Sequence, residues 1–258
     1  MEFIQIHGAK IPVIGLGTWP LRGKECRDAV LSALDAGYRH LDTAQMYENE
    51  KEVGDALRKS GIPREDVFIT TKISSPHLSH DDVLEFFEIS REKLQIEYVD
   101  LLLIHWHSPK VPVAETIHAM NQLQSARRVN HIGVSNFSVP QTREAMEASQ
   151  TPVLTNQVPY DPFHKQSGLL EFCIHNDVML TAYSPLDKGR AVKNSLLRKI
   201  GEKYGKTAAQ VILRWLIQQK NVSAIPKSGH PGRQKENLNI FDFELLPEDM
   251  EKIFGLPH

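Results

Sequence analysis

The feature that most constrains the fold is an alternation of two sequence patterns along the chain. Short apolar runs rich in β-branched residues occur eight times, at Pro12–Leu16, Arg39–Leu41, Val67–Thr71, Val99–Ile104, His131–Val134, Val153–Asn156, Val178–Ala182 and Val222–Ile225. Amphipathic stretches with helical spacing separate most of them, at Glu25–Ala36, Asp81–Leu94, Pro112–Gln124, Pro140–Ala148, Gly168–His175, Ser195–Lys203 and Thr207–Gln218. Strands that alternate with helices form a parallel sheet. The sequence therefore predicts an α/β fold.

Two closures of such a sheet compete, an open doubly wound sheet and a closed barrel. Eight βα units in 258 residues fit a (β/α)₈ TIM barrel. An open dinucleotide-binding sheet needs a third glycine after its first strand, and here Gly15 and Gly17 are followed by Trp19 and Pro20 instead. We therefore expect the barrel, with an N-terminal β-hairpin, Phe3–Ile6 and Lys10–Val13, that closes its bottom.

Composition narrows the class of protein further. The chain is 41% hydrophobic and 24% charged, which is typical of a globular protein. Its net charge of −2, from 30 basic and 32 acidic residues, offers no field that would attract nucleic acid or an anionic membrane. Two cysteines, Cys26 and Cys173, suit a reducing compartment, and neither a signal peptide nor a membrane span is visible. We expect one soluble cytoplasmic domain over residues 1–258.

Polar residues stand where several predicted strands end. Asp42, Lys72, His105 and Ser135 follow one another at steps of 30, 33 and 30 residues, about one βα unit each, and Tyr47 lies in the loop after Asp42. In a TIM barrel the C-terminal strand ends face the active site. The spacing therefore predicts that a carboxylate, a phenol, an amine and an imidazole meet at one mouth.

This set of groups favours proton donation to a carbonyl oxygen. A free tyrosine is a weak acid at neutral pH, and an adjacent ammonium lowers its pKa. We expect Tyr47 to be the acid, Lys72 to tune it, and Asp42 to keep the buried Lys72 charged. His105 would orient the substrate oxygen or share the proton relay. The side chains include no hydride donor, so a cofactor must supply one.

At these residues the chain resembles the aldo-keto reductase superfamily, closest to short prokaryotic members of the 2,5-diketo-D-gluconic acid reductase type. The resemblance runs from about Lys10 to about Asn237. It rests on six motifs in order: Gly15-Leu16-Gly17-Thr18-Trp19, Gly37–Ala44 with Tyr47 and Asn49-Glu50, Tyr98–Leu101, Ile104–Trp106, Ile132–Phe137, and Ile225–Ser228 with Arg233 and Glu236-Asn237.

The resemblance implies NADPH-dependent reduction of aldehydes and ketones, including keto sugars, sugar acids and small or aromatic aldehydes, by a monomeric enzyme without metal. It implies that NADPH/NADP⁺ contacts Thr18, Ser135, Asn136, Gln157, Tyr183, Ser184, Leu186, Lys227, Ser228, Arg233, Glu236 and Asn237. Among these, Ser135, Asn136 and Gln157 would hold the nicotinamide carboxamide, and Tyr183 would stack on its ring. Lys227, Ser228 and Arg233 would take the adenosine 2′-phosphate, and Glu236 and Asn237 would reach the adenine. Trp19, Tyr47, His105 and Trp106 would contact the substrate.

Two departures from longer family members predict an open site. The sequence ends at His258, soon after what we take as the last helix, which opens at Pro231, so a long C-terminal loop over the substrate is not expected. Only Asp187–Arg190 follows Tyr183–Leu186 before the next helix, so we expect a short cofactor-covering loop, fast cofactor release and loose specificity.

Two other functions stay open. The same barrel could bind NADPH as a regulatory or sensing module with little turnover, although such a module has no need of a proton donor. A metal-assisted hydrolase is the third reading, because His105 and His107 are two residues apart and share a face. It needs a further ligand, and none stands out in the sequence.

Overall fold

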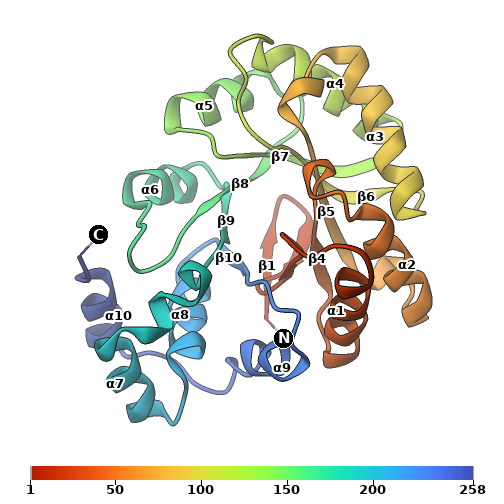
Figure 1. Cartoon of the computed structure of the whole chain (residues 1–258). Coiled ribbons are helices and arrows are strands. Elements are labelled where there is room, and N and C mark those ends of the chain that lie inside the picture. The colour runs from red at the N-terminus through yellow and green to blue at the C-terminus, as the bar shows by residue number, and fades with distance from the viewer. Residues whose placement is uncertain (1, 258) are drawn as a thin grey trace.

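The computed structural model describes residues 2–257 and confirms the predicted barrel. Over these residues eight parallel strands pair in chain order: β3 (Leu16–Gly17), β4 (His40–Asp42), β5 (Phe68–Ile73), β6 (Val99–Ile104), β7 (Val129–Ser135), β8 (Val153–Pro159), β9 (Met179–Tyr183) and β10 (Val222–Ile225). A parallel bridge between Ile14 and Ala224 brings β10 back to the start of the series. Figure 1 shows the strands around a centre and the helices outside them.

The helices surround the strands. They are α1 (Gly23–Ala36), α2 (Glu50–Ser60), α3 (His80–Leu94), α4 (Val113–Ser125), α5 (Val139–Ala148), α6 (Ser167–His175), α7 (Ser195–Tyr204), α8 (Ala208–Ile217), α9 (Pro231–Leu238) and α10 (Pro247–Phe254). Most of them bury one apolar stripe; α8 is buried on nearly all sides, and α9 buries the polar Gln234 and Asn237. In α3, Val83, Phe87 and Leu94 face the core. Ser79 accepts a hydrogen bond from the Asp82 backbone N–H and so caps the free amides of its first turn.

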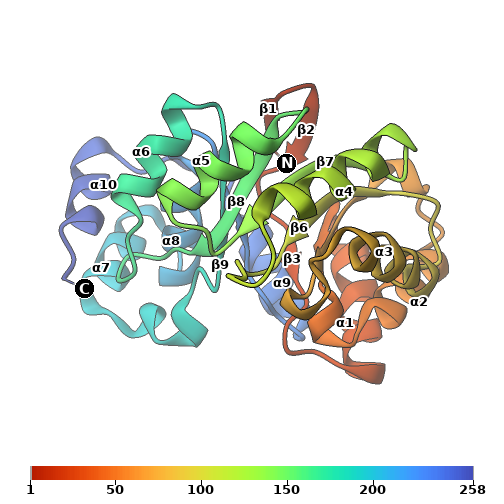
Figure 2. The same ribbon diagram turned by 90° about the horizontal axis from the view of Figure 1, so that it is seen from above.

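The N-terminal hairpin closes one end of the barrel, as predicted. It consists of β1 (Phe3–Ile6) and β2 (Ala9–Pro12), joined by His7 and Gly8, both with the positive φ that a two-residue hairpin turn requires. Ile6, Ala9 and Ile11 form one apolar cluster with residues of the barrel strands, namely Phe68, Leu101, Leu103, Leu154 and Met179. Seen from above, the hairpin lies at one end of the strands (Figure 2).

Two boundaries near the start of the chain differ from the prediction. Pro12 belongs to the hairpin strand β2, and the first barrel strand is Leu16–Gly17 instead of Pro12–Leu16. Periodicity could not separate the two, because one apolar run serves first the hairpin and then the barrel wall.

Two helices were absent from the sequence prediction. Helix α2 lies between β4 and β5, and α10 follows α9, so the helix that opens at Pro231 is not the last one. Helix α10 packs on α8 through Phe254, whose ring centroid is 5.0 Å from that of Trp215. Pro247, Glu248 and Asp249 are a helix-start signal that could have revealed it.

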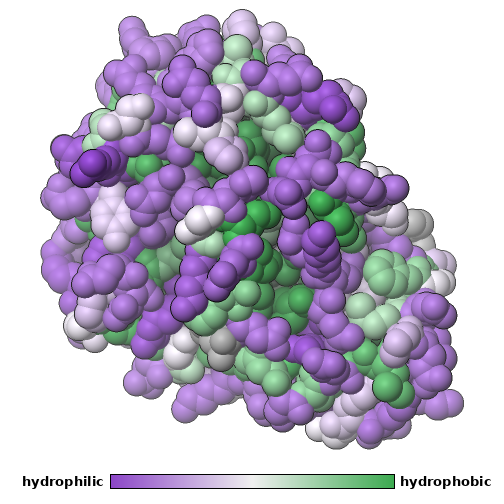
Figure 3. All heavy atoms as spheres, turned by 180° about the vertical axis from the view of Figure 1, so that it is seen from behind, coloured by the Kyte–Doolittle hydropathy of each residue, from purple (hydrophilic) through white to green (hydrophobic). Residues whose placement is uncertain are grey.

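The outer surface is mainly hydrophilic. In the view from behind (Figure 3), apolar residues show near the middle of the face, between hydrophilic side chains that cover most of it. Within residues 2–257 no helix combines the length and the apolar character needed to cross a bilayer.

Candidate active site

Four predicted residues come together at the C-terminal ends of the strands. Asp42 ends β4, Lys72 lies near the end of β5, and His105 directly follows β6. Tyr47 ends the short 3₁₀ helix η1 (Gln45–Tyr47) in the loop after β4. The Lys72 Nζ donates to Asp42 Oδ1 at 2.6 Å and lies 3.2 Å from the Tyr47 hydroxyl oxygen.

The pleat of β5 explains why Lys72 points inward. Successive side chains of a strand face opposite sides. The Thr71 hydroxyl donates to Glu50 Oε1 of α2 at 2.6 Å, on the helix side of the strand, so Lys72 faces the barrel interior. The Lys72 side chain is fully buried and also donates to the Thr43 carbonyl at 2.8 Å. A buried ammonium is tolerated only with such partners.

The Asp42 carboxylate is bound on both oxygens. Its Oδ1 takes Lys72, and its Oδ2 accepts a 2.7 Å hydrogen bond from Gln157 Nε2 of β8. The Thr18 hydroxyl donates to the Asp42 backbone carbonyl at 2.9 Å. These bonds fix the carboxylate, and through it the ammonium that lies against Tyr47.

Asn49 is a buried positioning residue that the sequence analysis quoted without a role. Its Nδ2 donates to the backbone carbonyls of Thr18 and Leu21, and its Oδ1 accepts from the Thr43 hydroxyl. It therefore ties the loop that carries Tyr47 to the segment that carries Trp19. Its place directly after the Tyr47 loop, in a motif with Glu50, was the available signal.

The pKa of Tyr47 differs in direction from the prediction. Burial raises the pKa of this phenol above its ordinary value, and the Lys72 ammonium, which lowers it as expected, offsets only part of the rise. Burial alone would lower the pKa of Lys72, but the Asp42 carboxylate beside it raises that pKa overall. Both groups therefore hold their protons at neutral pH.

His105 is neutral at neutral pH. Burial, together with the positive charge of Lys72, lowers its pKa to about 3. Its ring meets that of Tyr47 edge to face, with centroids 5.6 Å apart. The Nδ1 atom is buried and has no hydrogen-bond partner among residues 2–257. A neutral imidazole here can orient a substrate oxygen, but it carries no proton to spare for catalysis at neutral pH.

These groups line a catalytic cavity of about 350 Å³ at the barrel mouth. Asp42, Tyr47 and His105 line it, while Lys72 lies behind them. The half-exposed rings of Trp19 and Trp106, which were expected to contact the substrate, also line it.

A second, longer cavity of about 1000 Å³ continues from the first. Four residues line both cavities: Trp19, Ser184, Lys188 and Lys227. All twelve residues expected to contact the cofactor line one cavity or both. Thr18, Ser135, Asn136, Gln157, Tyr183, Ser184 and Lys227 line the catalytic cavity, and Ser184, Leu186, Lys227, Ser228, Arg233, Glu236 and Asn237 line the long cavity.

The amides expected at the nicotinamide are already engaged within the protein. Gln157 holds Asp42 through Nε2, which leaves its Oε1 to accept another hydrogen bond. Asn136 Nδ2 donates to the His105 carbonyl at 3.1 Å, and Asn136 Oδ1 accepts from the Tyr183 hydroxyl at 2.9 Å. The Tyr183 ring is thereby fixed against the cavity that the catalytic groups line.

The long cavity is lined by more cations than the sequence analysis named. Lys227 and Arg233 were expected, while the basic residues Lys188, Arg198, Lys206 and His230 were not. His230 caps α9, because its Nδ1 accepts from the Gly232 backbone N–H at 3.1 Å. Because Nδ1 accepts this bond, Nε2 carries the ring hydrogen and is free to act as a donor. The Glu236 carboxylate accepts from the Thr207 hydroxyl at 2.6 Å.

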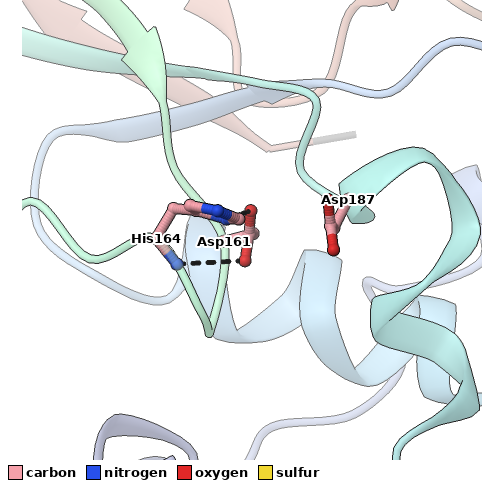
Figure 4. Close-up of side chains that lie close together, drawn as sticks. All are labelled: Asp161, His164 and Asp187. Carbon is pink, nitrogen blue, oxygen red and sulfur yellow. Dashed lines mark hydrogen bonds and ion pairs between the residues drawn. The ribbon is translucent and has the colours of Figure 1, made fainter. Parts of the chain in front are cut away.

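The geometry offers no third ligand to a metal at His105 and His107. His107 packs edge to face on Phe137. Over the described part of the chain, the one group of three possible ligands is Asp161, His164 and Asp187, whose ligand atoms lie within 4.8 Å of one another (Figure 4).

That group lies in loops after β8 and β9, and its charges have partners within the protein. His164 Nδ1 is 2.8 Å from Asp161 Oδ2, and Arg190 donates to Asp187 Oδ1 at 2.6 Å. The guanidinium already supplies the positive charge that a metal would bring. Each of the two carboxylates therefore has its partner on its own loop.

Comparison with known proteins gives one consistent result. The model of the aldo/keto reductase family matches residues 13–256. The chain is 41% identical to a 9,11-endoperoxide prostaglandin H2 reductase of Trypanosoma cruzi, over 97% of this chain and 89% of the relative. It is 40% identical to a glyoxal reductase of Bacillus subtilis, over 99% and 92%. A crystal structure of a candidate 2,5-diketo-D-gluconic acid reductase B superimposes with a TM-score of 0.98 at 44% identity, over 100% and 92%.

Proposed function

The chain belongs to the aldo/keto reductase family and is a carbonyl-reducing oxidoreductase, and from that premise we propose that it uses NADPH as cofactor and Tyr47 as proton donor. One observation carries the proposal. The Tyr47 hydroxyl lies 3.2 Å from the ammonium of Lys72, and Lys72 is itself paired with Asp42, at the base of a cavity that leads into a longer one.

Tyr47 is the group suited to protonate the substrate oxygen. Its raised pKa keeps the phenol protonated at neutral pH, and an alkoxide is far more basic than a phenolate. Proton transfer to the developing alkoxide is therefore favourable. Lys72 stabilises the phenolate that remains, because its ammonium is the nearest charge to that oxygen.

His105 serves as an orienting donor to the substrate oxygen. With a pKa of about 3 it is neutral, so it contributes a hydrogen bond without a net charge. Its position edge to face with Tyr47 places both groups on one side of the cavity. A carbonyl oxygen held between them would receive the proton from Tyr47 alone.

The long cavity suits a phosphorylated nicotinamide cofactor. When bound, the reduced nicotinamide supplies the hydride that the carbonyl carbon accepts. Lys227, Ser228 and Arg233 would hold the 2′-phosphate, with His230 as a further donor, at the start of α9 where amides also favour an anion. Ser135 and Gln157 would hold the carboxamide, and Tyr183 would stack on the ring.

The substrates we propose are small or aromatic aldehydes, keto sugars and sugar acids. The named relatives act on glyoxal, on a diketo sugar acid and on a prostaglandin endoperoxide. Trp19 and Trp106 are 50% and 46% exposed, so the aromatic rim of the cavity is open to solvent. An open rim accepts substrates of different size.

The test is oxidation of NADPH by the purified protein with methylglyoxal, an aromatic aldehyde, xylose, a diketo sugar acid and an apolar ketone, with NADH in parallel. Turnover with a preference for NADPH is expected. Tight NADPH binding, measured by fluorescence, with no turnover of any of these substrates would contradict the proposal and favour a sensing module.

A further inference from the structure

The turn between β9 and α7, which belongs to the segment expected to cover the cofactor, places a lysine with no assigned contact at the junction of the two cavities. Lys188 lines both, and its Nζ lies 5.8 Å from the centroid of the Trp19 ring. Trp19 belongs to the expected substrate wall. The lysine therefore stands beside the surface on which a substrate would rest.

The backbone of this turn is held in one conformation. Ser184, Asp187, Lys188 and Gly189 all have positive φ, between 45° and 87°. The Asp187 backbone N–H donates to the Ser184 carbonyl at 2.9 Å, and that of Gly189 donates to the Leu186 carbonyl at 2.8 Å. Left-handed residues outside glycine persist where surrounding bonds impose them.

The acidic neighbour of Lys188 is directed elsewhere. The Asp187 carboxylate pairs with Arg190 at 2.6 Å and lies near Asp161 and His164 of the preceding loop (Figure 4). Among the described residues, no carboxylate forms an ion pair with Lys188. Its ammonium is exposed and available to an anion.

The charge balance of the catalytic cavity points to an anionic ligand. Its charged lining consists of Asp42, Lys188 and Lys227, since His105 is neutral. Asp42 is already paired with the buried Lys72. Lys227 goes to the 2′-phosphate under the proposed function. Lys188 is the one remaining unpaired charge of this cavity lining.

We propose that Lys188 binds the carboxylate of the substrate, so that the enzyme prefers carbonyl compounds that carry a carboxylate over their neutral analogues. This inference rests on the proposed carbonyl reductase function. The body of the substrate lies on Trp19, its carbonyl faces Tyr47, and its carboxylate meets the ammonium. A lysine suits this task because it is a compact charge on a flexible stem, which can follow substrates of different length.

The test compares para-carboxybenzaldehyde with its methyl ester, which differ by one charge and keep the same ring and aldehyde. In Lys188→Met the stem keeps its packing on Trp19 and loses the charge. We expect kcat/KM for the acid to fall about tenfold through KM, while kcat/KM for the ester stays unchanged. Lys188→Arg should restore the preference for the acid.

Lys193→Met is the matched control. Lys193 lies in the 3₁₀ helix η5 (Ala191–Lys193) of the same connection, is exposed and lines neither cavity. Its loss removes the same charge from the same segment, so unchanged kinetics with both substrates are expected. An equal loss in both lysine variants would mean a general field effect and would overturn the proposal.

Lys188 could instead bind the pyrophosphate of the cofactor, and the affinity for NADPH distinguishes the two roles. If Lys188→Met weakens NADPH binding and lowers kcat/KM for acid and ester alike, the lysine binds the cofactor pyrophosphate and the proposal is wrong. If the wild type reduces neither aldehyde and none of the five substrates of the panel above, the proposed function fails. Calorimetry of para-(hydroxymethyl)benzoate and its methyl ester with the enzyme and NADP⁺ then still decides, since only the acid should lose affinity in Lys188→Met.

Discussion

The catalytic cavity and the long cavity beside it are built on different parts of the barrel. Around the catalytic cavity, Asp42, Lys72 and Gln157 come from strands and are buried, and Asp42 is hydrogen-bonded to both of the others. Of the cations that line the long cavity, Lys188 lies in a turn, Lys227 follows a strand, and Arg233 lies at the start of a helix. All three are exposed. A buried network loses much when one member is removed, whereas exposed cations act nearly independently.

The largest expected effect is on the proton donor of the catalytic cavity. Tyr47→Phe removes the hydroxyl and keeps the ring against His105, so we expect kcat to fall about 10²- to 10⁴-fold. The affinity for NADPH, measured by fluorescence, should be unchanged, because the cofactor contacts lie elsewhere. Loss of NADPH binding together with turnover would contradict the role of Tyr47.

Lys72→Met probes the buried network itself. The change leaves the Asp42 carboxylate buried without its counter-charge, which should lower the free energy of unfolding by about 3–5 kcal/mol. Denaturant unfolding measures the loss. The double variant Lys72→Met with Asp42→Asn removes both charges and should recover much of it. If the double variant is as unstable as the single one, the ion pair is not the cause.

The difference between residues on strands and residues in loops also separates what the sequence could predict from what it could not. Asp42, Lys72, His105 and Ser135 were predictable, because the spacing of one βα unit places each at a strand end, where the barrel geometry fixes its direction. The signature around Tyr47 added the acid by resemblance.

The loop residues carry no such periodicity. Lys188 stands in an irregular turn of left-handed residues that no spacing predicts, and His230 drew no expectation although it directly precedes Pro231, where a helix was expected to open. The raised pKa of Tyr47 was also out of reach, because the depth of burial that opposes Lys72 is a property of the packed barrel.

Arg233→Ala tests whether an exposed cation acts alone. If it meets the adenosine 2′-phosphate, its loss should weaken NADPH binding by about tenfold or more and leave NADH binding unchanged, since the two cofactors differ in that phosphate. Titration of each cofactor by fluorescence measures this. Lys235→Ala is the control, because Lys235 is exposed on the same helix and lines neither cavity. Equal weakening of both cofactors would overturn the assignment.

The smallest expected effect concerns the pH dependence of stability. It arises from His105, one of the buried residues of the catalytic cavity. The pKa of His105 is about 3 in the folded protein, below the 6.5 of a free imidazole. Between these values the unfolded chain binds more protons than the folded one, so stability is fully present above about pH 6.5 and falls as the pH is lowered. The slope from one such group is at most about 1.4 kcal/mol per pH unit.

His105→Asn removes this titration, because an amide takes up no proton in the range. Between about pH 6.5 and about pH 5, the free energy of unfolding measured with denaturant should therefore fall by about 1–2 kcal/mol less in the variant than in the wild type. His40 and His131, whose pKa values burial also lowers, contribute equally to both proteins and cancel in the difference. Arg233→Ala should keep the wild-type slope, since an exposed cation of the long cavity has no part in it. A variant slope equal to that of the wild type would mean that His105 takes up its proton over the same pH range in the folded site as in the unfolded chain, which would contradict its lowered pKa and make it a second possible proton donor.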